Sequence, residues 1–111
     1  METVTKEDIA GWFSEDVEVL KGAKILFAEY YTGNYEGSAF VLFSRHGKLY
    51  EVHGSHCSCY GLENQWNEEE TSVESLEHHL NGTYGFYEMN NAEIKTAVDK
   101  WKTNAAKRKS E

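Results

Sequence analysis

The stretch AFVLFSRHGKLYEV, residues 39–52, joins two apolar runs across the dipeptide His46-Gly47. A two-residue β-hairpin turn needs positive φ angles, which glycine adopts without strain. The dipeptide therefore predicts a tight turn between two antiparallel strands. Because the turn sets the strand pairing, it also predicts which side chains share a face of the sheet.

Two faces follow from this register, since side chains alternate along a strand. The first face carries the cross-strand pairs Phe43–Tyr50 and Val41–Val52, and the second carries Leu42–Glu51 and Phe40–His53. The first face is apolar throughout and is expected to form the core. The second mixes apolar and polar side chains, so we expect it to be only partly covered, as a groove or an interface.

A helix and two further strands are expected outside the hairpin. Thr5, followed by acidic residues, is typical of a helix N-cap, and the helix should continue or restart through residues 17–20. AKILFAEYY, residues 23–31, is rich in aromatic and β-branched residues and predicts a strand, with a turn over residues 32–37. TYGFYEM, residues 83–89, alternates in the same way and predicts another strand.

Two helices are expected after the hairpin. Thr71 with Glu74 forms a capping box, and the Asn-Gly pair at residues 81–82 predicts the end of that helix. The last helix should be capped at residues 90–91, and residues 104–111 should fray.

These elements predict one α+β domain over residues 1–111. Its small antiparallel sheet of three or four strands would pack with an N-terminal, a middle and a C-terminal helix. Hydrophobic residues make up 40% of the 111 residues and aromatic residues 14%, which is enough apolar surface for a single core.

Charge is unevenly distributed along the chain, whose net charge is −8. Residues 1–94 contain 17 acidic and 5 basic residues, whereas residues 95–111 are basic. Such an acidic body repels phosphate, so we expect no direct contact with nucleic acid and favour a protein partner with a basic surface. No apolar run is long enough to span a bilayer and the start lacks a signal-peptide pattern, so we expect a cytoplasmic protein without membrane contact.

A cluster of metal-ligating residue types lies in EVHGSHCSCYGLENQW, residues 51–66. Imidazole and thiolate are the ligands that zinc prefers, and the candidate ligands are His53, His56, Cys57 and Cys59. Their spacing is crowded, so a zinc site would need His78 or His79 as well. Otherwise no cofactor is expected.

Two alternatives remain open for the same segment. Cys57 or Cys59 could act as a nucleophile, with a neighbouring histidine as base and Glu63 orienting it. Alternatively, the segment forms a structured corner after a strand, with small residues permitting the turn and Trp66 in the core.

An acidic aromatic patch is expected at the first turn, and further contacts at the loop of residues 53–66. The candidate partner-binding residues are Glu29, Tyr31, Tyr35, Glu36, Tyr60 and Glu63. Carboxylates and tyrosine rings together suit arginine-rich surfaces, through ion pairing and stacking.

The segment GSAFVLFSRHGKLYEVHGSHCSCYGLENQW resembles small uncharacterised proteins encoded by phages and prophages, with an LYEV run followed by a GSHCSCYGLE-like stretch. The resemblance covers about residues 36–71. It implies a phage-like setting, in which short acidic proteins bind and block a host enzyme or defence complex. We therefore expect a binding protein of this kind rather than an enzyme. The alternatives are a metal- or cysteine-dependent site at residues 53–59 and a homodimer formed through the mixed face of the hairpin.

Overall fold

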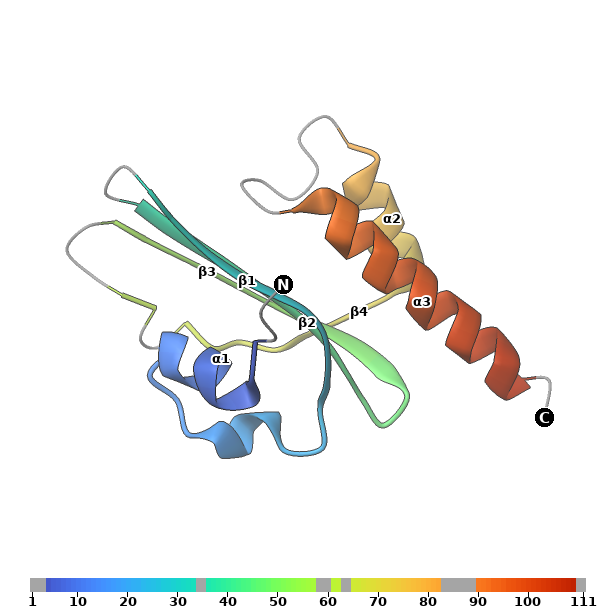
Figure 1. The fold of residues 1–111 in the computed structure, drawn as a ribbon, viewed down its shortest axis with the longest axis horizontal. Helices are drawn as coiled ribbons and strands as arrows, with labels where there is room; N and C mark the ends of the chain where they lie inside the picture. Colours follow the sequence, from blue (N-terminus) through green and yellow to red (C-terminus); the bar gives the residue numbers. More distant parts are fainter. Residues whose placement is uncertain (1–3, 34–35, 58–60, 63–64, 83–89, 110–111) are drawn as a thin grey trace.

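The computed structural model describes residues 4–33, 36–57, 61–62, 65–82 and 90–109. The elements are α1 (Lys6–Trp12), the 3-10 helix η1 (Val17–Leu20), β1 (Lys24–Gly33), β2 (Glu36–Arg45), β3 (Lys48–Cys57), β4 (Glu69–Thr71), α2 (Val73–Leu80) and α3 (Asn91–Lys109). The four strands form one antiparallel sheet in the order β1-β2-β3-β4. α1 and η1 lie on one side of this sheet, and α2 and α3 lie on the other (Figure 1). The predicted α+β fold is confirmed.

The central hairpin has the predicted turn and register. His46 and Gly47 have φ angles of 54° and 79°, as a two-residue turn between antiparallel strands requires. The four pairs expected between β2 and β3 are all present, from Phe43 opposite Tyr50 to Phe40 opposite His53. The local sequence of the turn was therefore sufficient to predict which side chains share a face.

Each face of the sheet has its own buried core. The first core, under α1 and η1, consists of Ile9, Phe13, Leu20, Ala23, Ala39, Val41, Phe43, Val52 and Leu62. The second, under α2 and α3, consists of Phe27, Phe40, Leu42, Leu49, Leu76, Ile94, Ala97 and Val98. Val41 and Phe43 are fully buried on one side of β2, and Phe40 and Leu42 are buried on the other.

The second face is only partly covered, as predicted, but its centre is buried. Phe40 and Leu42 are 1% and 0% exposed because helices of the same chain pack over them. A homodimer through this part of the hairpin would have to displace α2 and α3. The sequence did not reveal this cover, because the helices that provide it come from residues far along the chain.

A β-bulge in β1 was not predicted. Ile25 pairs with Phe43 and Phe27 pairs with Leu42, so Leu26 is an extra residue in β1. Ile25 packs against the first core, whereas Leu26 and Phe27 both pack in the second. The bulge thus gives the second core two consecutive apolar side chains from one strand.

The start of α1 confirms the predicted N-cap. The Thr5 hydroxyl accepts a hydrogen bond from the Asp8 backbone N–H at 3.1 Å, and the Asp8 carboxylate accepts one from the Thr5 N–H at 3.1 Å. These reciprocal bonds satisfy N–H groups that have no partner within the helix.

The cap of α2 differs from the prediction by one residue. Ser72 is the N-cap and accepts from the Ser75 N–H at 3.1 Å, while Thr71 is the last residue of β4. Glu69 and Glu70, with Thr71, form this short strand. The helix does end at Leu80, as predicted from the Asn-Gly pair.

α3 begins as predicted but extends further. The Asn90 side chain accepts a hydrogen bond from the Glu93 N–H at 3.2 Å and so caps the helix. The helix then continues to Lys109, past residue 104, where fraying was expected. The strand predicted over residues 83–89 lies outside the described residues.

After β3, the described residues Leu62, Gln65 and Trp66 pack against the sheet. The Gln65 side-chain N–H group donates to the carbonyl oxygens of Ser55 at 2.8 Å and Gly61 at 3.3 Å, while its oxygen accepts from the Ser55 N–H at 2.8 Å. Gln65 thus pairs with the outer edge of β3, beyond the three residues that β4 covers. Leu62 is fully buried, and the Trp66 ring packs edge-on against Phe13 at 5.2 Å. The structured-corner interpretation is therefore corrected for residues 53–57, which continue β3, while Leu62 and Trp66 after the strand pack with the first core.

Arg45, at the end of β2, ties the hairpin to two other segments. Its guanidinium donates to the carbonyl oxygens of Val19 at 2.6 Å and Lys21 at 3.2 Å. It also forms an ion pair with the Glu68 carboxylate at 2.7 Å. Trp66 donates its indole N–H to the other Glu68 oxygen at 3.0 Å. Side-chain bonds of this kind hold η1 and the chain before β4 against the sheet.

We expect Gly54→Ala to destabilise the fold by about 1–3 kcal/mol, because overpacking a full core forces its neighbours to move. A Cβ atom at Gly54 would lie 2.9 Å from Leu62 and 3.0 Å from Phe13. The matched control is Gly11→Ala in α1, where a Cβ meets nothing within 4 Å. It should stabilise the protein by about 0.5–1 kcal/mol. Urea unfolding of both variants checks this, and equal stability of the two would contradict the packing described for Gly54.

Candidate functional site

The structure does not bring the two predicted histidine ligands together. The His53 ring stacks on Phe40, with centroids 4.8 Å apart, and so lies on the second face of the sheet. His56 is hydrogen-bonded to the Tyr30 hydroxyl, which packs against the first core. Three residues apart on a strand, the two rings lie on opposite faces and cannot bind one ion in this arrangement.

The other residues of the predicted cluster give no complete site. Cys59 and the Cys57 side chain lie outside the described residues, as does Glu63. The backbone of Cys57 pairs with Glu36 at the end of β3. Among the residues that the structure describes, no group of three His, Cys, Asp or Glu side chains is arranged to hold a metal ion. The zinc and thiol hypotheses therefore remain predictions that depend on residues 57–60.

Three of the predicted partner-binding residues share one surface. Glu29, Tyr31 and Glu36 belong to the second face by their register in β1 and β2. Tyr31 lies opposite Ser38, which lies opposite Ser55, and Glu29 lies opposite Phe40, which lies opposite His53. We call the surface formed by Glu29, Tyr31, Glu36, Ser38, His53 and Ser55 the distal face. Figure 1 shows the ends of β1, β2 and β3 that carry it reaching past α2 and α3.

Exposure differs within the distal face. Tyr31 is 40% exposed and, with Val17, is one of two large hydrophobic side chains that are exposed among the described residues. Glu36, His53 and Ser55 are also exposed. Glu29 instead accepts a hydrogen bond from the Asn90 backbone N–H at 2.9 Å and so ties β1 to the start of α3. Its role is at least partly structural. Tyr35, Tyr60 and Glu63 lie outside the described residues.

A carboxylate–imidazole pair borders the distal face. The Glu51 carboxylate and the His53 Nε2 atom are 3.0 Å apart, and the side chains are 20% and 46% exposed, respectively. The hydrogen bond from His53 lowers the pKa of Glu51 below its usual value, and partial burial opposes this effect. A bond from Thr71 and the charges of His53 and His79 lower the pKa further. Glu51 therefore stays ionised and holds the His53 ring in place.

A tyrosine–histidine pair on the first face was not predicted. Tyr30 and His56 are hydrogen-bonded, and their rings meet edge-on at 5.7 Å. Trp12, from α1, packs edge-on against Tyr30 at 5.6 Å. The pair joins α1 to the ends of β1 and β3. The sequence signal for it was present, because Tyr30 and His56 each fall on the first face once the register is known.

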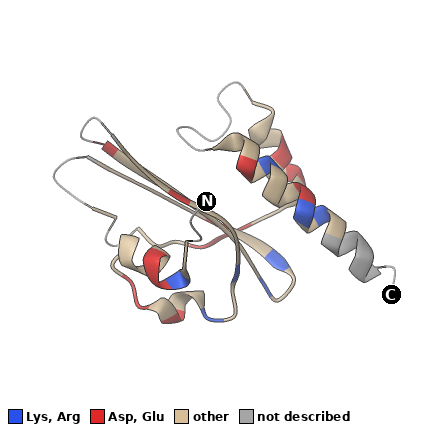
Figure 2. Cartoon of the chain, in the orientation of Figure 1, with Lys and Arg blue, Asp and Glu red and all other residues tan. Residues whose placement is uncertain are grey.

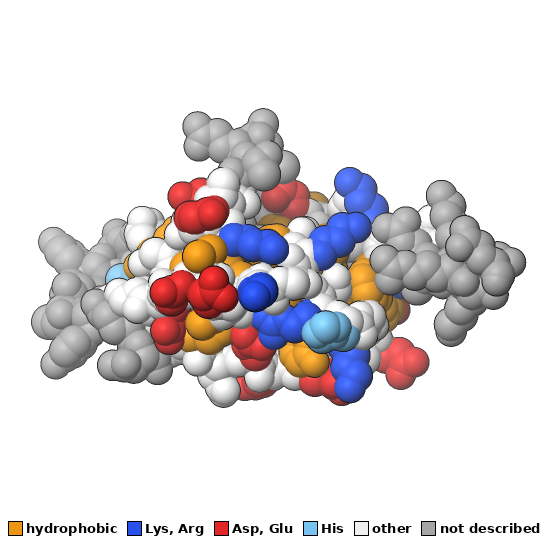
Figure 3. All heavy atoms as spheres, turned by 90° about the horizontal axis from the view of Figure 1, so that it is seen from below, with side chains coloured by type: hydrophobic (Ala, Val, Ile, Leu, Met, Phe, Trp, Pro, Cys, Tyr) orange, Lys and Arg blue, Asp and Glu red, His pale blue; other side chains and the backbone are white. Residues whose placement is uncertain are grey.

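The helices α1 and η1, which cover the first core, carry a second acidic surface. Figure 2 shows acidic residues in both α1 and η1, and Figure 3 shows acidic side chains gathered over these elements, with basic ones toward the β2–β3 turn. Glu7, Asp8, Asp16 and Glu18 are exposed, and Val17 among them is 36% exposed. We call Glu7, Asp8, Asp16, Val17 and Glu18 the α1–η1 face. Acidic and apolar groups lie together on this face, as they do on the distal face.

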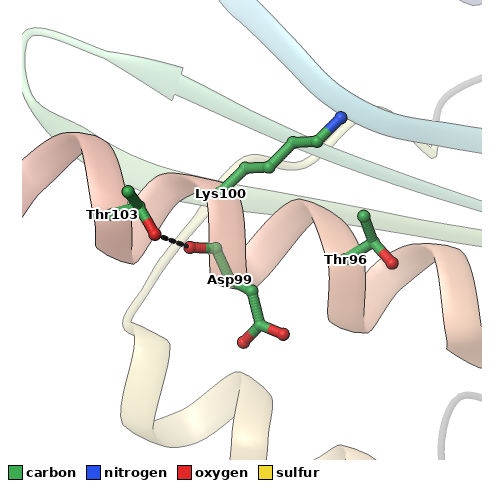
Figure 4. A pocket seen from close by; sticks show the side chains of 4 residues that line it. All are labelled: Thr96, Asp99, Lys100 and Thr103. Carbon is green, nitrogen blue, oxygen red and sulfur yellow. Dashed lines mark hydrogen bonds between the residues drawn. The ribbon is translucent and has the colours of Figure 1, made fainter.

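A hollow of about 390 Å³ along α3 is lined by Thr96, Asp99, Lys100 and Thr103 (Figure 4). The Thr96 hydroxyl donates to the Ala92 carbonyl oxygen and the Thr103 hydroxyl to that of Asp99, both at 3.0 Å. Lys100 and Asp99 point in different directions (Figure 4). The threonine hydroxyls are thus bonded to their own helix rather than directed at a common point.

No protein-family model, curated protein or solved structure matches this chain. None of the described helices has both the length and the hydropathy of a membrane-spanning helix.

We expect Glu51→Gln to lower stability near neutral pH by about 1 kcal/mol, because it removes a charge-assisted bond to His53. Folding lowers the pKa of this carboxyl group, so the ionised group stabilises the fold at pH values above its unfolded-state pKa. This stabilisation is lost as the pH falls through the folded-state pKa. The ordinary pKa of a glutamate side chain, from which that of Glu51 is lowered, is 4.5. Urea unfolding should therefore give the variant and the wild type equal free energies of unfolding only in acid, at a pH well below this pKa.

The matched control is Glu69→Gln. Glu69 is exposed and lies directly opposite Glu51 in the β3–β4 pair, where like charges repel. This change should leave stability unchanged or raise it slightly. If Glu51→Gln were destabilised by the same amount in acid as at neutral pH, the loss of the ionised carboxylate would not explain the destabilisation.

Proposed function

We propose that the protein is a small binding protein that docks its distal face onto a basic surface of another protein. The observation that carries the proposal is the exposed ring of Tyr31 on the same face as the Glu36 carboxylate, at strand ends beyond α2 and α3. An arginine side chain can pair with the carboxylate and stack on the ring. The β-strands beneath are held by two cores, so the surface is displayed on a rigid support.

The charge of the chain supports the same kind of partner. The net charge of −8 favours encounter with basic surfaces over acidic ones. Such docking depends on exposed charges, and salt therefore weakens it.

The proposal extends to a setting. On the resemblance of residues 36–71 to phage and prophage proteins, the partner is a host enzyme or defence complex in the cytoplasm, and docking blocks its basic site. Capture of a partner from a bacterial lysate would identify that host protein.

We expect the double variant Tyr31→Ala/Glu36→Lys to bind a basic partner at least about tenfold more weakly than the wild type, because it removes both the exposed ring and the nearby carboxylate. The direct readout is titration of a fluorescent arginine-rich peptide. The wild-type protein is then used to capture binding proteins from a bacterial lysate at low and high salt. A captured partner is titrated against the wild type and the variant in the same way as the peptide.

The matched control is Val17→Ala/Glu18→Lys, which makes an equivalent change on the α1–η1 face. It should retain the affinity of the wild type apart from a modest effect of net charge. If this control lost binding and the distal-face variant kept it, the docking surface would be the α1–η1 face. If neither the peptide nor a lysate protein bound the wild type, the proposed function would be wrong.

A further inference from the structure

The two edges of the sheet differ in how they are covered. On β3, residues 49–51 pair with β4, and the Gln65 side chain bonds both backbone groups of Ser55. On β1, the described part of the chain supplies one neighbouring strand, β2, which lies on the inner side. Sheet edges that are left uncovered are commonly protected from other chains by a lysine or by a bulge.

β1 carries these protective features in its first half. Lys24 begins the strand, and the bulge at Leu26 interrupts its pairing. Residues 28–32 instead pair regularly with β2, and their side chains are exposed or partly exposed. We call the outer side of residues 28–32, with which no other described strand pairs, the open edge.

The register determines which backbone groups point out of the open edge. In an antiparallel pair, alternate residue pairs exchange hydrogen bonds, and the pair that closes a two-residue turn is one of them. Arg45 and Lys48 close the β2–β3 turn, so odd-numbered residues of β2 bond to β3 and even-numbered ones bond to β1. Even-numbered residues lie opposite Glu29 and Tyr31, whose backbone groups therefore point to β2.

Ala28, Tyr30 and Thr32 alternate with those two residues and direct their N–H and C=O groups out of the open edge. A strand added here would bond to them and place one row of side chains on each face of the sheet. Ala28 and Tyr30 pack against the first core together with Trp12, and these three side chains are partly exposed. An apolar row on the first face would therefore bury more of them.

On the second face, the added row would lie beside the Glu29 and Tyr31 side chains, in the residue pairs whose side chains come closest. Glu36 belongs to the same face at the start of β2. Residues 25–44 contain no lysine or arginine, so carboxylates determine the charge beside the open edge. Basic side chains suit this row, whereas a second copy of the chain would bring its own carboxylates against it.

We propose that β1 accepts an extended segment of the partner as a further strand along the open edge, with basic side chains on the second face and apolar ones on the first. This inference rests on the proposed function and names the form of the partner, in which basic and apolar residues alternate along a strand. Backbone hydrogen bonds then supply affinity, and the alternating side chains supply selectivity.

The first test compares two N-methylated forms of a short peptide in which arginine and valine alternate. We expect methylation of the valine amides to weaken binding to the full chain at least about tenfold, because these amides face the open edge and lose their hydrogen bonds. Methylation of the arginine amides, which face solvent, should keep the affinity within about threefold. Equal affinities of the two forms, or weaker binding of the arginine-methylated form, would overturn the inference.

The matched protein variants are Thr32→Pro and Thr32→Val, at an exposed residue of the open edge. Proline removes an outward N–H group and blocks an added strand, yet it is tolerated where that group does not serve the sheet itself. Thr32→Pro should bind the unmethylated peptide at least about fivefold more weakly than Thr32→Val, which keeps the N–H group. Urea unfolding checks that both variants are folded, and equal binding by the two folded variants would contradict strand addition.

Amide hydrogen exchange tests the wild type directly. Exchange at Tyr30 and Thr32 should slow when the unmethylated peptide binds, whereas Tyr31, already bonded to β2, should change little. Unchanged exchange in the complex, or slow exchange at Tyr30 and Thr32 in the free protein, whether dilute or only when concentrated, would overturn the inference. Binding of a helical arginine-rich peptide but not of the alternating one would overturn it and leave the proposed function intact. Binding of neither peptide would overturn both.

Discussion

The whole structure depends on the double-sided burial of β2. Alternate side chains of this strand enter different cores: Val41 and Phe43 pack under α1 and η1, and Phe40 and Leu42 pack under α2 and α3. A strand that is apolar on both faces is stable only when both faces are covered, so this segment requires a three-layer arrangement. The Arg45 guanidinium, at the end of the same strand, then bonds η1 and the chain before β4 to the sheet.

Local features of the fold could be predicted from the sequence. The His46-Gly47 turn, the register that follows from it and the Thr5 cap each depend on residues within a few positions of one another. The bulge at Leu26 and the strand β4 could not be predicted in this way. Their physical cause is packing and pairing with distant segments, which an isolated stretch of sequence does not reveal.

The candidate site could be predicted only in part. Tyr31 and Glu36 are exposed and share a face, as an interaction surface requires, but Glu29 is engaged with the start of α3. The separation of His53 from His56 was not predicted, because the expected hairpin strand ended near His53, whereas β3 continues to Cys57. Three residues apart on one strand, the two side chains lie on opposite faces. The hydrogen bonds between the Gln65 side chain and the backbone of Ser55 on β3 could not be predicted, because they depend on how the chain folds after the strand.

The distal face combines a rigid support with exposed acidic and aromatic side chains. The two cores hold the strands beneath it, and the Glu51–His53 pair sits at its border with α2. Preorganised surfaces of this kind lose little conformational entropy on binding, so a few exposed groups can determine affinity. The α1–η1 face is similarly acidic but lies on the other side of the sheet, which makes the two surfaces separable by position.

The most direct test is therefore to map the docking surface on the wild-type protein. Backbone amide chemical shifts would be followed while the arginine-rich peptide is added. We expect the largest changes at Tyr31, Glu36, Ser38 and Ser55, with residues of α1 and η1 nearly unaffected. Changes centred on the α1–η1 face, or no changes at saturating peptide, would contradict docking through the distal face.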